Sequence, residues 1–302
     1  MTRKPQVGWL RDGRRLYLQD GPIDLIVEAH GSRANLRAAY AAAIGRFTGL
    51  LDELCDELAL LRTAADPAAC ALHGVVARRM HAAVAPFARD HFITPMAAVA
   101  GSVAEEILNA MVQAALLDRA YVNNGGDIAL HLTDGEQFTV GLLDRPDPLG
   151  LMRTTTIRGC EPARGVATSG RHGRSFSLGI ADAVTVLART AAQADAAATI
   201  IANAVDLPDH PAVARCPAQE IQPDSDLGAR LVTRDVGLLE KSDIAIALAA
   251  GSAKTRQLLA RGLIEAAVLH LCGETCVIGV KSPDANVVGR PARKVNESMI
   301  HA

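Results

Sequence analysis

Three short clusters combine glycines, hydroxyls and charged side chains in patterns that can bind an anion or a metal ion. The first is Asn-Asn-Gly-Gly-Asp at residues 123–127, between two strand-like segments. Paired glycines tolerate positive φ and expose consecutive backbone amides, so a turn of Asn124, Gly125, Gly126 and Asp127 can wrap a pyrophosphate. An Asn-Gly-Gly turn is also typical of a plain hairpin. Taken alone, this cluster favours the hairpin.

The second cluster, residues 165–175, follows a strand with hydroxyls, glycines and basic side chains. Hydroxyls and loop amides donate hydrogen bonds to phosphate oxygens, and arginines add charge-assisted ones. The alternative is a solvated turn. The residues predicted to contact a ligand here are Thr168, Ser169, Gly170, Arg171 and Arg174.

The third cluster lies in an alanine-rich segment, where Asp195 and Thr199 are four residues apart. On a helix this spacing places both side chains on one face, where a carboxylate and a hydroxyl can bind magnesium. The alternative is an ordinary aspartate near the start of a helix. Without the other two clusters, that alternative is favoured.

Taken in order, the clusters resemble the ApbE superfamily, typified by a magnesium-dependent transferase that moves FMN from FAD to a protein threonine. They resemble a small uncharacterised branch of that superfamily more closely still. The match is strong over residues 94–205 and weak in the flanks. The motifs that carry it are Thr-Pro-Met-Ala-Ala-Val-Ala-Gly at 94–101, the Gly-Gly turn at 123–127, Thr-Ser-Gly at 168–170, Ala-Asp-Ala-Val at 181–184 and Ala-Asp-Ala-Ala-Ala-Thr at 194–199.

The resemblance implies an α+β fold in which helices flank an antiparallel sheet, as a single domain of two intimately packed lobes over residues 1–302. It also implies a cleft for FAD or another flavin nucleotide, lined by the Gly-Gly turn and the Thr-Ser-Gly segment. Magnesium would be held by Asp195, Thr199 and a backbone carbonyl near Gly101 or Ser102.

Two motifs of the transferases are missing: a lysine soon after the helix glycine, and a histidine-hydrophobic-hydrophobic-aspartate-proline loop after Thr-Ser-Gly. We therefore expect flavin binding to persist better than flavin transfer. Asp182 and His172 are the candidate general bases, because each lies near the second cluster in sequence.

Three functions remain open at this point. One is an enzyme that acts on a nucleotide pyrophosphate by transfer or hydrolysis, with Arg171 or Arg174 stabilising the charge. Another is a non-catalytic flavin or nucleotide binder that serves a partner pathway. A purely structural role ranks last, since it leaves the three clusters unexplained.

The elements that must position these clusters follow from the hydrophobic periodicity. A hairpin is expected over 14–19 and 23–29, then one or two helices over 34–62 and helices over 70–87 and 96–117. Strands are expected at 120–123, 128–132, 137–142, 164–167 and 183–188, and helices at 191–204 and 257–263. Residues 208–226 look irregular, 267–280 form a hairpin, and 282–302 make a frayed tail.

Composition limits the remaining classes of function. The net charge of −2 and the absence of a long basic block argue against a nucleic-acid binder, so we expect a small-molecule nucleotide ligand, with a flavoprotein as a possible partner. Six scattered cysteines suit a reducing compartment, and Cys272 and Cys276 are read as strand residues flanking a turn. No secretory signal and no apolar run of about 18 residues is visible, so we expect a cytoplasmic protein without a membrane span. A homodimer and a monomer both remain open.

Overall fold

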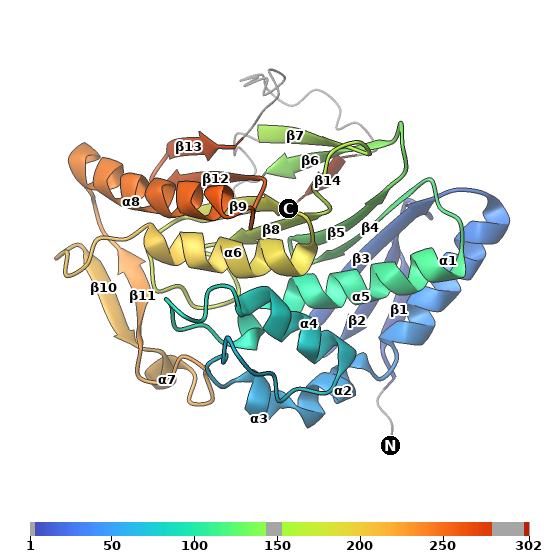
Figure 1. Ribbon diagram of the computed structural model, residues 1–302, viewed down its shortest axis with the longest axis horizontal. Helices are drawn as coiled ribbons and strands as arrows, with labels where there is room; N and C mark the ends of the chain where they lie inside the picture. The colour runs from blue at the N-terminus through green and yellow to red at the C-terminus, as the bar shows by residue number, and fades with distance from the viewer. Residues whose placement is uncertain (1–3, 143–152, 280–298, 302) are drawn as a thin grey trace.

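The computed structural model of the chain describes residues 4–142, 153–279 and 299–301. The fold is α+β, as predicted, with helices layered on one face of a large antiparallel sheet (Figure 1). The strands are β1 Gln6–Trp9, β2 Leu16–Asp20, β3 Ile23–His30, β4 Arg119–Asn124, β5 Asp127–Leu132, β6 Gln137–Leu142, β7 Arg153–Arg158, β8 Gly165–Ser169, β9 Ala183–Ala188, β10 Val213–Pro217, β11 Leu231–Val236, β12 Ala266–Leu271, β13 Glu274–Ile278 and β14 Met299–His301. The helices are α1 Arg33–Phe47, α2 Leu50–Asp56, α3 Leu58–Leu61, α4 Val75–Val84, the 3-10 helix η1 Pro95–Ala98, α5 Val99–Ala114, α6 Ala191–Ala204, α7 Ala218–Ile221 and α8 Lys241–Ala260.

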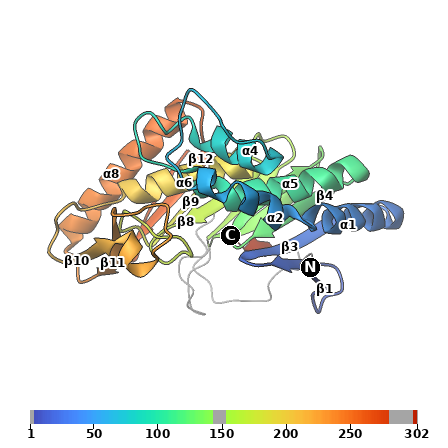
Figure 2. The same cartoon turned by 90° about the horizontal axis from the view of Figure 1, so that it is seen from below.

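The main sheet has nine strands in the order β1-β2-β3-β4-β5-β8-β9-β12-β13, and every neighbouring pair is antiparallel. Strand order therefore follows chain order, with β6–β7 and β10–β11 set aside in two small sheets. In one of these, β14 pairs in parallel with β6. Figure 2 shows helices α4, α5, α6 and α8 together on one side of the main sheet.

Alternation along the strands gives the sheet two buried faces. In β4, Ala120 and Val122 join the large core beneath the helices, whereas Tyr121 joins a smaller core on the other face with Phe138 and Ile157 of β6 and β7. The helix-side core is rich in alanine, above all from α6. Small side chains allow close approach of helices and sheet, as the low aromatic content of the chain predicts.

Several elements form where the sequence predicts them. The β2–β3 hairpin turns at Gly21 and Pro22, β6, β9 and α6 have the expected bounds, and β12 and β13 form the expected hairpin. Cys276 lies in β13 as expected, whereas Cys272 lies in the turn of that hairpin with a φ of +49° and not in a strand. All six cysteines are free thiols.

Other elements differ from the prediction for local reasons. The one or two helices expected over 34–62 are three: Gly49 adopts a φ of +83° that separates α1 from α2, and a second break at Glu57 separates α2 from α3. The helix expected from residue 96 starts as η1, and the Thr94 hydroxyl donates to Asp226 instead of capping it. The helix expected over 70–87 is confined to Val75–Val84.

The sequence reading also missed elements in its irregular segments. β7, β10, α7 and β11 form where no regular structure was expected. α8 starts at Lys241, far before the expected residue 257, behind a capping box of Glu240 and Asp243. Of the tail expected to fray, residues 282–298 and 302 lie outside the described residues, but Met299–His301 form a strand.

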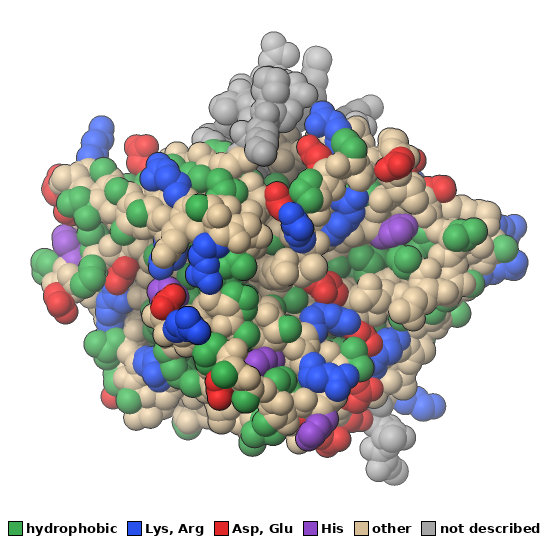
Figure 3. Space-filling model, in the orientation of Figure 1, with side chains coloured by type: hydrophobic (Ala, Val, Ile, Leu, Met, Phe, Trp, Pro, Cys, Tyr) green, Lys and Arg blue, Asp and Glu red, His purple; other side chains and the backbone are tan. Residues whose placement is uncertain are grey.

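The surface facing the viewer in Figure 3 carries basic and acidic side chains intermixed, without a large field of either sign. Within the described ranges, no helix combines the length and apolarity needed to cross a bilayer.

Candidate functional site

The candidate site lies where the first turns of α5 and α6 meet, at the ends of β4, β5 and β8. Gly101 in α5 packs so closely on α6 that a Cβ there would lie 2.3 Å from the carbonyl oxygen of Ala191. The Ala192 amide at the start of α6 donates to Glu105 Oε1 of α5 at 2.7 Å. Backbone packing and this hydrogen bond together fix the two helix starts relative to each other.

Asp195 projects from α6 toward the start of α5. Its Oδ2 accepts a hydrogen bond from the Gly101 amide at 3.0 Å, and the carboxylate thereby satisfies one of the free N–H groups at the start of that helix. Burial raises the pKa of Asp195 well above its ordinary value, and the negative charge of Asp127 raises it further.

Asp127 is the first residue of β5 and faces the same junction. Its Oδ1 accepts from the Thr168 amide of β8 at 3.2 Å. Burial raises the pKa of Asp127 to about 7, although the Thr168 amide and the Arg174 guanidinium both favour the charged form. The structure therefore brings two partly desolvated carboxylates, from the first and third sequence clusters, into mutual repulsion.

The Gly-Gly turn is both a hairpin and a wall of this site. Asn124 and Asp127 are paired across the β4–β5 hairpin, with Gly125 and Gly126 at φ values of +65° and +113°. Asn124 Nδ2 donates to the Ala100 carbonyl at 3.2 Å, which ties the turn to the start of α5. The hairpin predicted for this cluster is thus confirmed, and the binding of a pyrophosphate by the turn stays a prediction.

The loop after β8 contributes mainly through Thr168 and Arg174. Thr168 presents its amide to Asp127 and its hydroxyl to Thr185 at 2.8 Å, while Ser169 ends the strand. The exposed Arg174 lies over the Gly-Gly turn, its guanidinium carbon 3.4 Å from a Cβ built on Gly125. It is the basic side chain whose charge acts on Asp127.

The two candidate general bases form a separate ion-pair cluster. Asp182 Oδ1 accepts from Arg171 Nη2 at 2.6 Å and lies 3.2 Å from His172 Nε2, and its Oδ2 accepts from the Cys272 amide at 2.5 Å. A Cβ on Gly170 would lie 2.5 Å from the Asp182 carbonyl oxygen, so the loop is pressed against this residue. Asp182 thus anchors the loop to the β12–β13 turn, and Arg171 is held by that anchor.

The other residues predicted as metal ligands, Thr199, Gly101 and Ser102, differ in which groups they present at the junction. Thr199 stands one turn beyond Asp195 on the same face of α6. Gly101 presents its amide, an N–H donor, to Asp195. The Ser102 carbonyl accepts from Arg79 Nη1 at 3.0 Å, and the buried Ser102 hydroxyl has no hydrogen-bond partner among the described residues.

The side-chain and carbonyl groups at the junction that could bind a cation all offer oxygen atoms. Among the described residues there is no group of three or more His, Cys, Asp or Glu side chains that could hold a metal ion. A cation at this junction would therefore have Asp127 and Asp195 as its carboxylates, completed by hydroxyls, carbonyls and water. This set fits magnesium, which prefers hard oxygen ligands and keeps several waters.

The sequence did not predict that Asp127 and Asp195 share one site, because the motifs assigned Asp127 to the nucleotide and Asp195 to the metal. It also missed a charged network behind the junction, in which Arg79 binds Glu105 and Glu106 at 3.3 and 2.9 Å and Arg46 binds Glu106 at 2.7 Å. The adjacent glutamates of α5 were the available signal for this network. Their arginine partners come from α4 and α1, so sequence spacing alone does not reveal them.

Comparison with known proteins assigns the chain to a recognised sequence family. Proteins described as "UPF0280 protein" are similar to part of the chain. The protein from Methanothrix thermoacetophila is 40% identical over 117 residues, covering 37% of this chain and 46% of the relative. That from Methanopyrus kandleri is 42% identical over 130 residues, covering 42% and 48%, and that from Methanothermobacter thermautotrophicus is 40% identical over 119 residues, covering 39% and 44%.

The chain thus spans about half the length of the curated relatives it matches. A family described as "AbpE bacteria" matches much more of it, from residue 7 to residue 277. This match includes all the residues that meet at the junction of α5, α6, β5 and β8. The chain therefore belongs to the AbpE bacteria family.

Proposed function

We propose that this protein binds a flavin-type nucleotide together with magnesium at the junction of α5 and α6. The observation that carries the proposal is that Asp127 and Asp195, each held by a backbone amide from a different element, face one junction and interact electrostatically. Two desolvated carboxylates repel each other, and a divalent cation held by Asp127 and Asp195 would remove that cost. Membership of the AbpE family and the resemblance of the motifs to flavin transferases support the choice of ligand.

The nucleotide would lie along the Gly-Gly turn, with its pyrophosphate near Arg174. This arginine is exposed and faces the turn, whereas Arg171 is committed to Asp182. Magnesium, when bound, supplies positive charge that neutralises a pyrophosphate. Asp195, Asp127 and Thr199 would hold the ion, and the amides of the turn and of the segment from Thr168 to Gly170 would orient the phosphates.

Binding without transfer is favoured over catalysis by the state of the candidate bases. The Asp182 carboxylate is bound by three residues, Arg171, His172 and Cys272, so both of its oxygens are already occupied by partners within the protein. The lysine and the loop that flavin transferases carry are absent from the sequence. A transferase-like or hydrolase-like action on the pyrophosphate remains the second candidate, favoured by the placement of Arg174 beside the turn.

Calorimetric titration with FAD, with and without magnesium, tests the metal assignment. In Asp195→Asn an amide oxygen still accepts from Gly101, so the fold persists while one negative charge is lost. We expect the gain in FAD affinity caused by magnesium to fall about tenfold or more in Asp195→Asn and in Asp127→Asn, equivalent to at least ~1.4 kcal/mol. In Asp195→Ala the gain in FAD affinity caused by magnesium should fall by at least as much.

The matched control is Asp52→Asn, which removes the same charge from an exposed position on α2 and should change nothing. Thermal unfolding of each variant shows that the fold is intact. An unchanged magnesium effect in both Asp127→Asn and Asp195→Asn would reject the site.

A further inference from the structure

A second concave site lies at the far end of β3 from the Gly-Gly turn. It has a volume of about 570 Å³, within the range of small-molecule sites, and is formed by β1, the loop before β2, the end of β3 and one face of α1. The first site is near Pro22, whose carbonyl contacts Arg174, whereas this pocket is lined by residues from Glu28 onward. With a rise of about 3.3 Å per residue along β3, the two sites are separated by roughly 20 Å.

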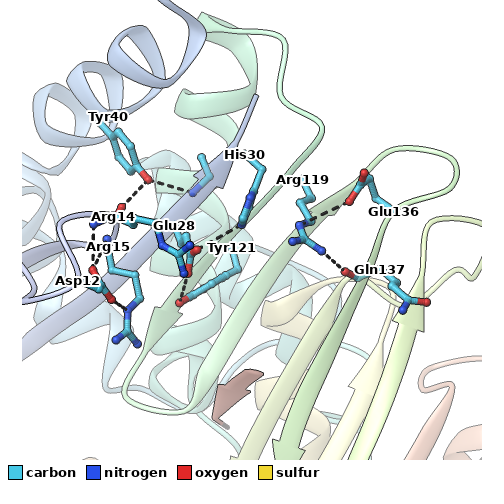
Figure 4. Close-up of polar contacts among 11 residues, drawn as sticks. Asp12, Arg14, Arg15, Glu28, His30, Tyr40, Arg119, Tyr121, Glu136 and Gln137 are labelled. Atoms are coloured by element: carbon cyan, nitrogen blue, oxygen red, sulfur yellow. Dashed lines mark hydrogen bonds and ion pairs between the residues drawn. The ribbon is translucent and has the colours of Figure 1, made fainter. Parts of the chain in front are cut away.

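One wall of this pocket is aromatic and fixed in place. Trp9 packs edge-on against Tyr40, with ring centroids 5.0 Å apart. The Tyr40 hydroxyl donates to the Arg14 carbonyl at 2.9 Å and accepts from the Ala29 amide at 3.1 Å (Figure 4). Trp9 is nevertheless 54% exposed, so a large apolar side chain on a short edge strand is left open to the pocket.

The buried carboxylate of the pocket is already neutralised by its neighbours. Glu28 lies 3.3 Å from His30 Nε2 and accepts from the Tyr121 hydroxyl at 3.2 Å (Figure 4). Burial alone would raise the pKa of Glu28, but His30, Tyr121 and Arg14 together hold it below its ordinary value. Glu28 is therefore a wall group whose hydrogen-bond partners and the countercharge of Arg14 come from the protein itself.

Two further cations of the pocket have no such countercharge. Arg33 and Arg37 are one turn apart on α1, both line the pocket, and neither makes an ion pair or a side-chain hydrogen bond within the described part of the chain. They occupy the first two turns of α1, which has no acidic residue in its first turn. Both side chains are exposed, and the dipole of a helix makes that end positive, so these two guanidinium groups would gain from pairing with a bound anion.

We propose that this pocket binds a small organic anion that carries a flat apolar group. The guanidinium groups of Arg33 and Arg37 hold its carboxylate or phosphate, and Trp9 and Tyr40 cover its flat part. Guanidinium groups match both anions in geometry, and an aromatic edge or face packs well on a ring. This site and its ligand are independent of the metal and nucleotide proposed at the α5–α6 junction.

Trp9 supplies the test, because it is the only tryptophan of the chain. Its fluorescence is titrated with phenyl phosphate, which has both the anion and the ring, and with inorganic phosphate and benzyl alcohol, which have one each. We expect a saturable change with phenyl phosphate at concentrations at least about fivefold below those of the other two probes. Arg33→Ala and Arg37→Ala should each weaken binding of phenyl phosphate by about five- to tenfold, as the loss of a charge-assisted contact predicts.

Arg256→Ala is the matched control, since it removes an exposed arginine of α8 that lies outside the pocket and should leave the affinity unchanged. Asp195→Asn should also bind phenyl phosphate as the wild type does, which separates this site from the first. Calorimetry replaces fluorescence if Trp9 does not respond. The proposal is overturned if neither method detects binding, or if Arg33→Ala and Arg37→Ala bind as tightly as the wild type.

Discussion

Asp195 combines two roles that make opposite demands on its charge. As the acceptor for the Gly101 amide it is favoured in its ionised form, because a carboxylate at a helix start interacts well with the N–H groups there. As a neighbour of Asp127 in a desolvated site it is favoured in its neutral form. The magnesium ion that we propose would resolve this conflict, and substitution by asparagine is therefore expected to separate the structural role from the proposed binding role.

Asp12 shows how a single carboxylate holds the second pocket together. Its Oδ1 accepts from the amides of Arg14 and Arg15 at 2.9 and 3.0 Å, and these contacts lower the pKa of Asp12 to about 2 (Figure 4). The loop that they fix carries Gly13 and Arg14, which line the pocket. Asp12 is therefore expected to stabilise that loop.

We predict that Asp12→Asn lowers the free energy of unfolding at pH 7 by about 1 kcal/mol, a value reduced for solvent exposure. Because the pKa is lower in the folded state, the stability is present above the unfolded value of about 3.9 and is lost as the pH falls toward 2. Urea unfolding of both proteins at pH 7, 4 and 3 should show the difference shrinking. A difference that stays constant over this range would show that the charge of Asp12 does not stabilise the loop.

At the scale of elements, the site depends on how closely α5 approaches α6. Gly101 makes that approach possible, since any side chain there would overlap the backbone of Ala191. The same contact brings the amide of Gly101 within reach of Asp195. Helix packing and site geometry are thus set by one residue.

We predict that Gly101→Ala lowers the free energy of unfolding by about 1–3 kcal/mol, as overpacking does, and weakens magnesium-dependent nucleotide binding. The matched control is Gly45→Ala in the last turn of α1, where a Cβ would meet nothing within 4 Å. There the same change should stabilise the protein by about 0.5–1 kcal/mol. Chemical unfolding measures the free energy of unfolding of both variants. If Gly101→Ala is as stable as the wild type, α5 can shift away from α6 without cost.

The elements around the site were predictable because their signals are local. Alternation from Ala183 to Ala188 and the alanine-rich period from Ala191 to Ala204 gave β9 and α6 with their observed bounds. The start of α8 was not predicted, because its capping box is made by Glu240 and Asp243 ahead of a weakly amphipathic segment. The hydroxyl of Thr94 was expected to cap a helix but found a partner 132 residues away, which no local rule can anticipate.

The candidate site shows the same difference between local sequence signals and contacts that form only in the folded chain. Motif order was sufficient to expect the Gly-Gly turn, the segment from Thr168 and Asp195 in one place, and the structure brings them together. The repulsion between Asp127 and Asp195 depends on burial and on strand order, which are properties of the folded chain. The ion pairs of Asp182 with Arg171 and of Glu105 with Arg79 likewise appear only after folding.

For the whole molecule, we predict binding of FAD without transfer of FMN to a partner. Protein incubated with FAD, magnesium and a threonine-bearing flavoprotein acceptor should retain flavin fluorescence without a covalently fluorescent acceptor band on a gel. The reason is that the proposed binding needs only the amides, hydroxyls and carboxylates of the junction, whereas transfer also requires groups to activate the acceptor. A flavin transferase in parallel is the positive control, and strong labelling by this protein would overturn the prediction.

The nine-stranded sheet also has a consequence for synthesis on the ribosome. Because its strands are added in chain order from β1 to β13, a nascent chain can extend the sheet at one edge while the rest is still being translated. After β5 emerges, however, β6 and β7 are made before β8 can pair with it. During that interval the open edge of β5 presents unpaired backbone groups. The edge of β9 stays open for longer, because α6, β10, β11 and α8 are made before β12 can pair with it. These are the two stages at which a nascent chain most needs protection by chaperones.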